Sequence, residues 1–102
     1  MTDLEITKLC AEAMELKSIH IRDNSVCFEN FFPSERYDPL HDDAQAMALV
    51  KRFRIHLNWW PTADKEIWEA TLLHGETDRK VGQRANLNRA ICECVAKMQA
   101  AK

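Results

Sequence analysis

Glycine and proline are scarce in this chain of 102 residues, which holds 2 Gly and 3 Pro. Disordered and loop-rich chains are usually rich in polar residues and in these two, so their scarcity beside 46% hydrophobic residues indicates a folded globular chain. Long hydrophobic runs are also missing, and none approaches the roughly 20 residues that a transmembrane helix needs. We therefore expect a single domain over residues 1–102 that does not enter a membrane.

An excess of charge of one sign is absent as well. The 14 Lys and Arg nearly balance the 16 Asp and Glu, and the net charge of −2 provides no bulk attraction to nucleic acid or to an anionic membrane. The first residues, MTDLEITKLC, lack the basic-then-apolar order of a secretory signal. Four cysteines in such a chain predict reduced thiols in a cytoplasm. They are Cys10, Cys27, Cys92 and Cys94.

Three segments show helical periodicity, and each begins at a capping residue. Thr2 and Glu5 form a capping-box pattern before a helix from about 3 to 16. Asp42 or Asp43 caps a helix from about 42 to 53. Asn86 caps a closing helix. The apolar stripes are Ile6, Leu9, Cys10 and Ala13 in the first, Ala46, Leu49, Val50 and Phe53 in the second, and Leu87, Ala90, Ile91, Cys94, Val95 and Met98 in the third.

In two segments apolar and polar residues alternate, as they do in half-buried β-strands. Residues 18–30 predict a short hairpin that turns at Asp23-Asn24. Residues 54–73 predict a second hairpin with a loop from Pro61 to Asp64, in which Leu57 faces Trp68. Residues 31–39 and 74–84 are expected to be loops. Together these elements predict an α+β fold with three helices packed on a small, mostly antiparallel sheet of about four strands.

The second hairpin has two faces of different character. We expect the inner face to belong to the core and the outer face to be mostly polar, because adjacent strand residues point to opposite sides. The inner face carries Ile55, Leu57, Trp59, Trp68, Ala70 and Leu72, and the outer face carries His56, Asn58, Trp60, Ile67, Glu69 and Thr71. This arrangement predicts a buried Trp59 and an exposed Trp60.

Catalytic and metal-binding motifs are weak. His41, Asp42 and Asp43 could form the metal dyad of a histidine–aspartate phosphohydrolase, but the pattern fits a helix start better, and the other histidines do not supply further ligands. Cys92 and Cys94 point about 160° apart on a helix, which does not suit one zinc ion. The spacing of Gly75 and Gly82 lacks a phosphate-loop pattern. We therefore expect no catalytic residues, no metal, no cofactor and no enzyme activity.

Several stretches resemble the phage ABA sandwich domain family of small bacteriophage and prophage proteins. They are Phe32-Pro33-Ser34, the Ala-rich helix DDAQAMALVKRF, Trp59-Trp60, and the closing helix NLNRAICECVAKM with its Ala90-Ile91. With the N-terminal helix they cover most of the chain. The resemblance implies one α/β domain in which a sheet is sandwiched with helices, and a place in a bacterial cytoplasm during phage or prophage life. It implies no catalytic residues.

These observations lead to a prediction of a non-catalytic module that binds a host or phage protein or a second copy of itself. Its candidate surface surrounds Trp60, because exposed aromatic side chains often anchor interfaces. The surface consists of Trp60, Ile67, His56 and Asn58. The alternative is a nucleic-acid-binding protein, in which Lys51, Arg52 and Arg54 contact phosphates and the tryptophans stack on bases.

Overall fold

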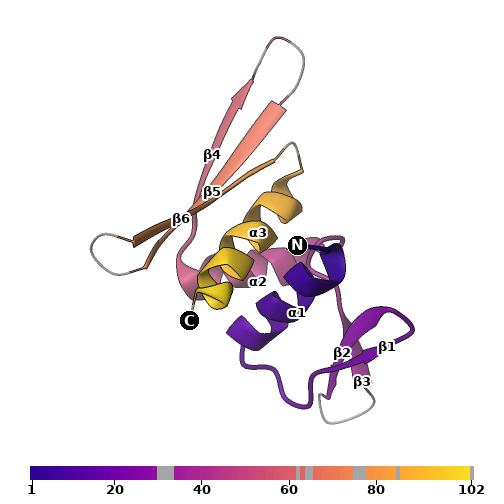
Figure 1. The fold of residues 1–102 in the computed structure, drawn as a ribbon. Coiled ribbons are helices and arrows are strands. Elements are labelled where there is room, and N and C mark those ends of the chain that lie inside the picture. Colours follow the sequence, from indigo (N-terminus) through magenta and orange to yellow (C-terminus); the bar gives the residue numbers. More distant parts are fainter. Residues whose placement is uncertain (30–33, 62, 64–65, 75–77, 85, 102) are drawn as a thin grey trace.

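The computed structural model describes residues 1–29, 34–61, 63, 66–74, 78–84 and 86–101. Figure 1 shows two sheets at opposite ends of the molecule, with three helices between them. The helices are α1 (Asp3–Ala13), α2 (Asp43–Phe53) and α3 (Leu87–Ala100). The strands are β1 (His20–Arg22), β2 (Ser25–Glu29), β3 (Ser34–Tyr37), β4 (His56–Pro61), β5 (Glu66–His74) and β6 (Asp78–Arg84).

The α+β class predicted from the sequence is confirmed, with two more strands than expected. The strands form two antiparallel sheets of three, in the orders β1-β2-β3 and β4-β5-β6. The additional strands are β3 and β6, which lie where loops were predicted. Of those predicted loops, residues 31–33 and 75–77 lie outside the described part of the chain.

Both missed strands depend on partners distant from the local pattern. β3 pairs with β2 so that Tyr37 faces Val26, and both side chains are buried. β6 carries charged residues and a glycine, which are poor strand formers, yet it pairs with β5 along its whole length. Tertiary pairing therefore overrides weak strand propensity in these two segments.

All three helix starts agree with the sequence. The side chains of Thr2, Asp42 and Asn86 each accept a hydrogen bond from the backbone N–H three residues later, at 3.1, 3.0 and 3.0 Å. The first hairpin also turns as predicted, since Asp23 and Asn24 have φ angles of 51° and 58°. Such positive φ values at both central residues are typical of a tight type I′ turn.

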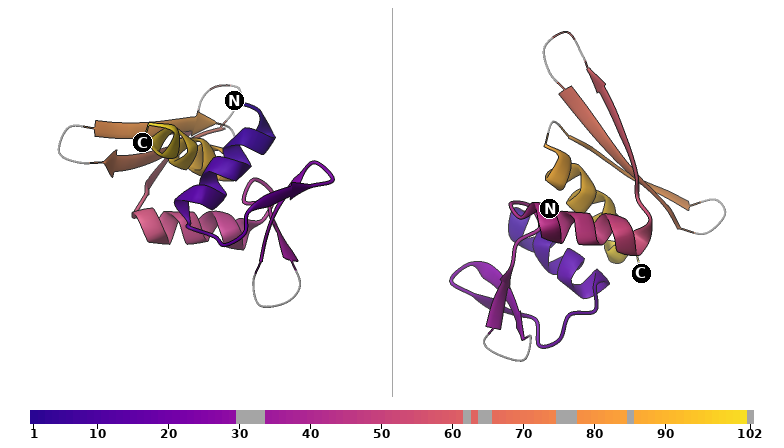
Figure 2. Two further views of the ribbon diagram at one scale, coloured as in Figure 1. Left: turned by 60° about the horizontal axis from the view of Figure 1, so that its bottom comes forward. Right: turned by 180° about the vertical axis from the view of Figure 1, so that it is seen from behind.

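Helix α3 occupies the centre of the molecule. It packs against α1 and α2 on one side and against β5 and β6 on the other (Figure 2). Consequently nearly every residue from Ala90 to Met98 is buried, and Lys97 is the exposed exception. The predicted stripe of α3 lies in the core except for Leu87, which is partly buried, and burial extends well beyond that stripe.

Cys92 and Cys94 lie on opposite sides of α3 and are covered by different elements. The Cys10 thiol donates a 3.4 Å hydrogen bond to the Cys92 carbonyl oxygen, which brings α1 against α3. The Cys94 sulfur accepts a hydrogen bond from the backbone of Leu72, in β5 on the opposite side. Both residues are fully buried and all four cysteines are free thiols. The stripe predicted from the sequence includes Cys94 and omits Cys92, yet Cys92 is equally buried, because α3 is covered on both sides.

We predict that Cys92→Ala and Cys94→Ala each lower the free energy of unfolding by about 1 kcal/mol, since each removes one buried sulfur. Urea unfolding followed by circular dichroism measures both values. Cys27→Ala is the control, because Cys27 is only partly buried. A Cys92 variant as stable as the native chain would contradict the two-sided packing of α3.

We also predict that stability decreases at alkaline pH. Burial raises the pKa of the Cys94 thiol from 9.0 to about 11, so the unfolded chain releases this proton before the folded chain does. The contribution of the buried Cys94 thiol to the free energy of unfolding is complete below the pKa of the unfolded chain. It is lost as pH increases from about 9 to about 11. Unfolding free energies measured across this range should decrease less steeply in Cys94→Ala than in the native chain. Equal slopes would contradict this assignment.

Candidate interaction surface

The hairpin of β4 and β5 projects from the helical body (Figure 1). The molecule measures 45 × 33 × 23 Å, and its radius of gyration of 13.8 Å slightly exceeds the value of about 13 Å usual for a compact domain of this length. In the hairpin Leu57 pairs with Ala70 and Trp59 with Trp68. The predicted pairing of Leu57 with Trp68 is therefore wrong by two residues. A shift of two leaves every side chain on its expected face.

Exposure of the inner face increases along the hairpin. Ile55, Ala70 and Leu72 at the base are buried, and Leu57 and Trp68 further out are half-buried. Trp59, nearer the end, is 47% exposed. The expectation that Trp59 belongs to the core is wrong, because the helices cover only the base of the hairpin. Its ring packs against Trp68 with centroids 6.3 Å apart, a usual distance for an aromatic pair.

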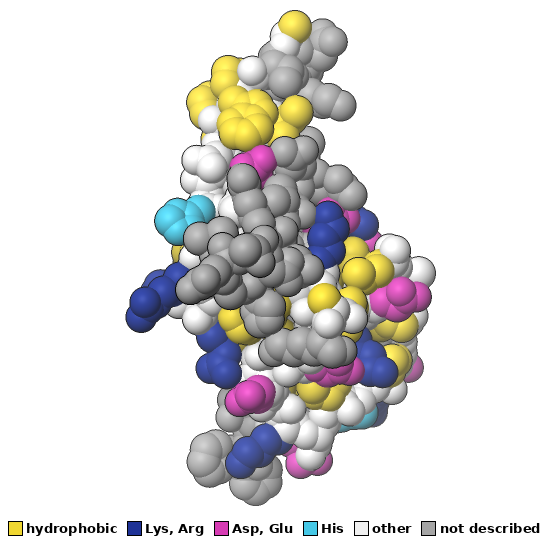
Figure 3. All heavy atoms as spheres, turned by 60° about the vertical axis from the view of Figure 1, so that its left-hand side comes forward, with side chains coloured by type: hydrophobic (Ala, Val, Ile, Leu, Met, Phe, Trp, Pro, Cys, Tyr) yellow, Lys and Arg dark blue, Asp and Glu magenta, His cyan; other side chains and the backbone are white. Residues whose placement is uncertain are grey.

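On the outer face the structure brings together the four residues proposed from the sequence. Trp60 lies directly opposite Ile67, and His56 and Asn58 continue the same face toward the base. Trp60 is 42% exposed, as predicted, and His56 and Asn58 are exposed too. Figure 3 shows hydrophobic side chains gathered at the far end of the hairpin. Both faces of this end thus present a tryptophan, and the surface is larger than the outer face alone.

The outer face becomes buried toward the middle of β5. Glu69 and Thr71 are each 7% exposed, and the Thr71 hydroxyl donates a 3.3 Å hydrogen bond to the Glu69 carboxylate. The exposed apolar region is therefore confined to the end of the hairpin. We name it the tryptophan tip, and it consists of Trp59, Trp60, Pro61, Ile67 and Trp68.

The basic segment lies at the end of α2 and before the start of β4. Arg52 donates to the Glu15 carboxylate at 3.5 Å, and its guanidinium lies 5.8 Å from the centre of the Phe53 ring. Arg54 ends α2 in a left-handed conformation, and Lys51 and Arg54 are exposed. Acidic side chains lie among the Lys and Arg side chains on the face in Figure 3. These cations lie before the start of β4, whereas the tryptophan tip lies at the end of that strand.

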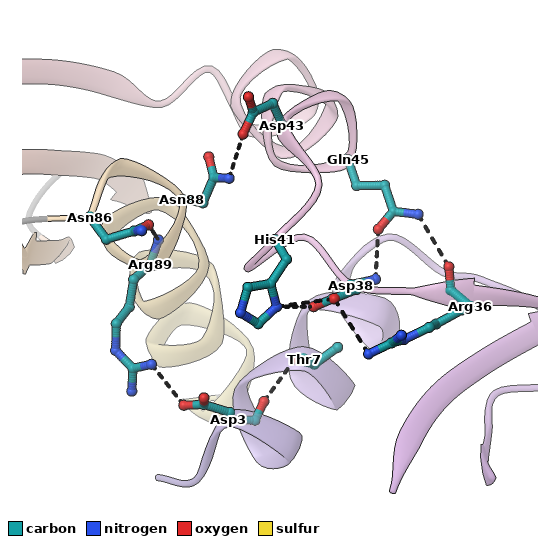
Figure 4. A network of polar contacts seen from close by, with 10 residues as sticks. All are labelled: Asp3, Thr7, Arg36, Asp38, His41, Asp43, Gln45, Asn86, Asn88 and Arg89. Atoms are coloured by element: carbon teal, nitrogen blue, oxygen red, sulfur yellow. Dashed lines mark hydrogen bonds and ion pairs between the residues drawn. The ribbon is translucent and has the colours of Figure 1, made fainter. Parts of the chain in front are cut away.

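His41 and its neighbours belong to a network of polar contacts (Figure 4). The Nδ1 atom of His41 lies 3.0 Å from both carboxylate oxygens of Asp38, in the turn before α2. Gln45 on α2 accepts from the Asp38 backbone N–H at 2.6 Å and donates to the Arg36 carbonyl oxygen at 3.3 Å. Asp42 is occupied as the helix cap. Within the described residues, no group of three His, Cys, Asp or Glu could hold a metal ion.

The same network links the first turns of all three helices. Arg89 on α3 donates to the Asp3 carboxylate on α1 at 2.7 Å, and Asn88 donates to the Asp43 carboxylate on α2 at 2.8 Å. A hollow of about 320 Å³ lies beside this second contact, lined by both of these polar side chains and by Met47. These polar side chains form hydrogen bonds with each other and connect the starts of the helices, so we assign them a structural role.

Sequence reasoning missed Trp59 as a surface residue and missed the role of Gln45. The first error could have been found by counting the helices, since two or three short helices cover only a few strand residues on a face. The bonds of Gln45 leave no helical or strand pattern, because they reach back seven and nine residues to Asp38 and Arg36, across the turn that joins β3 to α2.

Comparison of the chain with models of known protein families finds no match, and comparison with curated proteins finds no significant match. The resemblance to the phage ABA sandwich domain family thus stays a prediction. No helix in the described part of the chain is long and apolar enough to cross a membrane.

We predict that His41→Ala changes the free energy of unfolding by about 0.5 kcal/mol or less, as expected for an exposed side chain. We also expect the purified protein to carry no stoichiometric metal. Urea unfolding and elemental analysis test the two statements. One transition-metal ion per chain that disappears with His41→Ala would overturn the assignment as a helix start.

For Trp59→Ala we predict a loss of about 1–2 kcal/mol, less than the roughly 3–5 kcal/mol of a fully buried aromatic residue. Half of its surface is already in contact with water, so truncation removes less burial. Thermal and urea unfolding measure this value. A larger loss would show that Trp59 supports the core after all.

Proposed function

We propose that this protein is a non-catalytic protein-interaction module, a small phage or prophage accessory protein that works in a bacterial cytoplasm. It binds another protein through the tryptophan tip. The observation that supports this proposal is the exposure of Trp59 and Trp60 on opposite faces of one projecting hairpin. The family resemblance supports the phage context.

An exposed tryptophan is unfavourable in water but gives a binding partner a large apolar surface to cover. Apolar area in contact with water is unfavourable by roughly 25 cal/mol per Å², and tryptophan carries a large area on few rotatable bonds. A partner that covers the rings gains this energy with little loss of conformational entropy, and for this reason tryptophan is common at the energetic centre of interfaces. His56 and Asn58 beside Trp60 provide hydrogen-bonding groups at the rim.

Nucleic-acid binding is the alternative. It would use the exposed cations Lys51 and Arg54, with Arg52, and stack bases on the tryptophans. The net charge of −2 and the ion pair of Arg52 with Glu15 favour the protein partner. Treatment with nuclease separates the two proposals.

The test is affinity capture from bacterial lysate with the native chain and with Trp60→Ala, each with and without nuclease. We expect a protein that remains bound after nuclease treatment and whose recovery decreases at least tenfold with Trp60→Ala, the equivalent of about 1.4 kcal/mol. Recovery abolished by nuclease would support the alternative.

Met47→Ala is the matched control, because Met47 is 41% exposed and lies on α2 instead of the hairpin. It should capture the same protein as the native chain does. If Trp60→Ala and Met47→Ala behave alike, the tryptophan tip is not the binding surface.

A further inference from the structure

The two edges of the larger sheet differ in how well they are protected against pairing. β4 and β6 are the edge strands, because the order is β4-β5-β6. β6 reads DRKVGQR, with four charged residues in seven, and charges on an edge strand discourage further pairing. β4 reads HLNWWP and contains no Lys, Arg, Asp or Glu. Pro61 cannot donate a hydrogen bond, but it occupies only the last position, so the β4 edge is the less protected one.

The backbone of β4 is also regular. Six consecutive residues pair with β5 without a bulge, from His56 opposite Thr71 to Pro61 opposite Glu66. In such a strand about half of the N–H and C=O groups point away from the existing neighbour. Figures 1 and 2 show no other described element along this side of β4. Its outward groups are thus available to another strand.

We propose that β4 of two copies of this chain pair as antiparallel strands across a two-fold axis, which joins the two three-stranded sheets into one of six. The inner face of β4 favours a second copy as the occupant. The helices leave Leu57 half-buried and Trp59 47% exposed on this face. Antiparallel pairing of two copies places these apolar side chains beside those of the other copy.

The geometry favours two registers. The faces of the two sheets continue only when residues of equal parity oppose each other, so the axis passes at one residue of β4. Asn58 and Trp59 are the two central residues of the strand, and an axis at either one pairs the most residues. In the first register Trp59 lies opposite Leu57 of the second copy, and in the second it lies opposite Trp59 of the second copy. Either register covers the inner-face tryptophan that the helices leave 47% exposed.

The assembly would close at two copies. Pairing uses the β4 edge of both chains, and the edges that remain are the two charged β6 strands. An isologous contact of this kind forms a closed dimer instead of a filament. This inference goes beyond the proposed function, since it needs no other protein, and the dimer would place two Trp60 side chains on one continuous face.

The test uses purified protein in analytical ultracentrifugation over a concentration series. We expect the native chain to reach twice its mass of 11.8 kDa. Asn58→Lys and Asn58→Asp should each weaken dimerisation by roughly tenfold, because like charges then meet near the axis in both registers. An equimolar mixture of the two variants should restore the dimer, since the charges are then opposite.

Ala44→Lys is the control, since it adds one positive charge at an exposed position near the start of α2. It should dimerise as the native chain does. Hydrogen exchange of the native chain provides a measurement that needs no variant, and the β4 amides should be more protected at high concentration than after dilution.

A native chain that stays monomeric at every concentration would overturn the proposal. So would a dimer that Asn58→Lys and Ala44→Lys weaken equally, a mixture that fails to restore it, or protection that appears outside β4. None of these results bears on capture of another protein by the tryptophan tip, so the two proposals can fail separately.

Discussion

The burial of α3 on two sides is the interaction on which the rest of the structure depends. This helix provides the common surface for α1, α2, β5 and β6. Its residues include Ala90, Cys92, Cys94 and Ala96, all fully buried, and side chains this small let neighbouring elements approach closely. Polar contacts at its first turn fix the directions of α1 and α2, through Arg89 with Asp3 and Asn88 with Asp43. The core is therefore organised around one helix, with neither sheet extending through it.

A core arranged in this way covers only what lies next to α3. The base of the second hairpin is covered, and its end is left in water with tryptophans on both faces. The exposed tryptophans therefore follow from a mismatch between hairpin length and the area that three helices of 11, 11 and 14 residues can cover. A folded chain keeps such an exposed apolar end at a cost in free energy, which is the physical reason for assigning it a binding role.

Local signals determined the elements that could be predicted from the sequence. The caps Thr2, Asp42 and Asn86 and the Asp23-Asn24 turn each depend on one side chain and the adjacent backbone, so short patterns were sufficient. The strands β3 and β6 and the burial of Cys92 depend on what packs against them, and no local pattern records that. In the candidate surface, the alternation of strand residues correctly predicted that Trp60 lies on the exposed outer face. The prediction that Trp59 is buried was wrong, because alternation assigns a residue to a face but does not determine how far the helices extend along the strand.

All three tryptophans of the chain lie in β4 and β5, and none is among the fully buried core residues, although Trp68 packs against that core. Intrinsic tryptophan fluorescence thus reports on the hairpin, whereas far-ultraviolet circular dichroism is dominated by the three helices. The two signals observe different parts of one chain. If the end of the hairpin opens before the body unfolds, fluorescence will change first, and the separation of the two curves will measure how strongly the hairpin is coupled to the core.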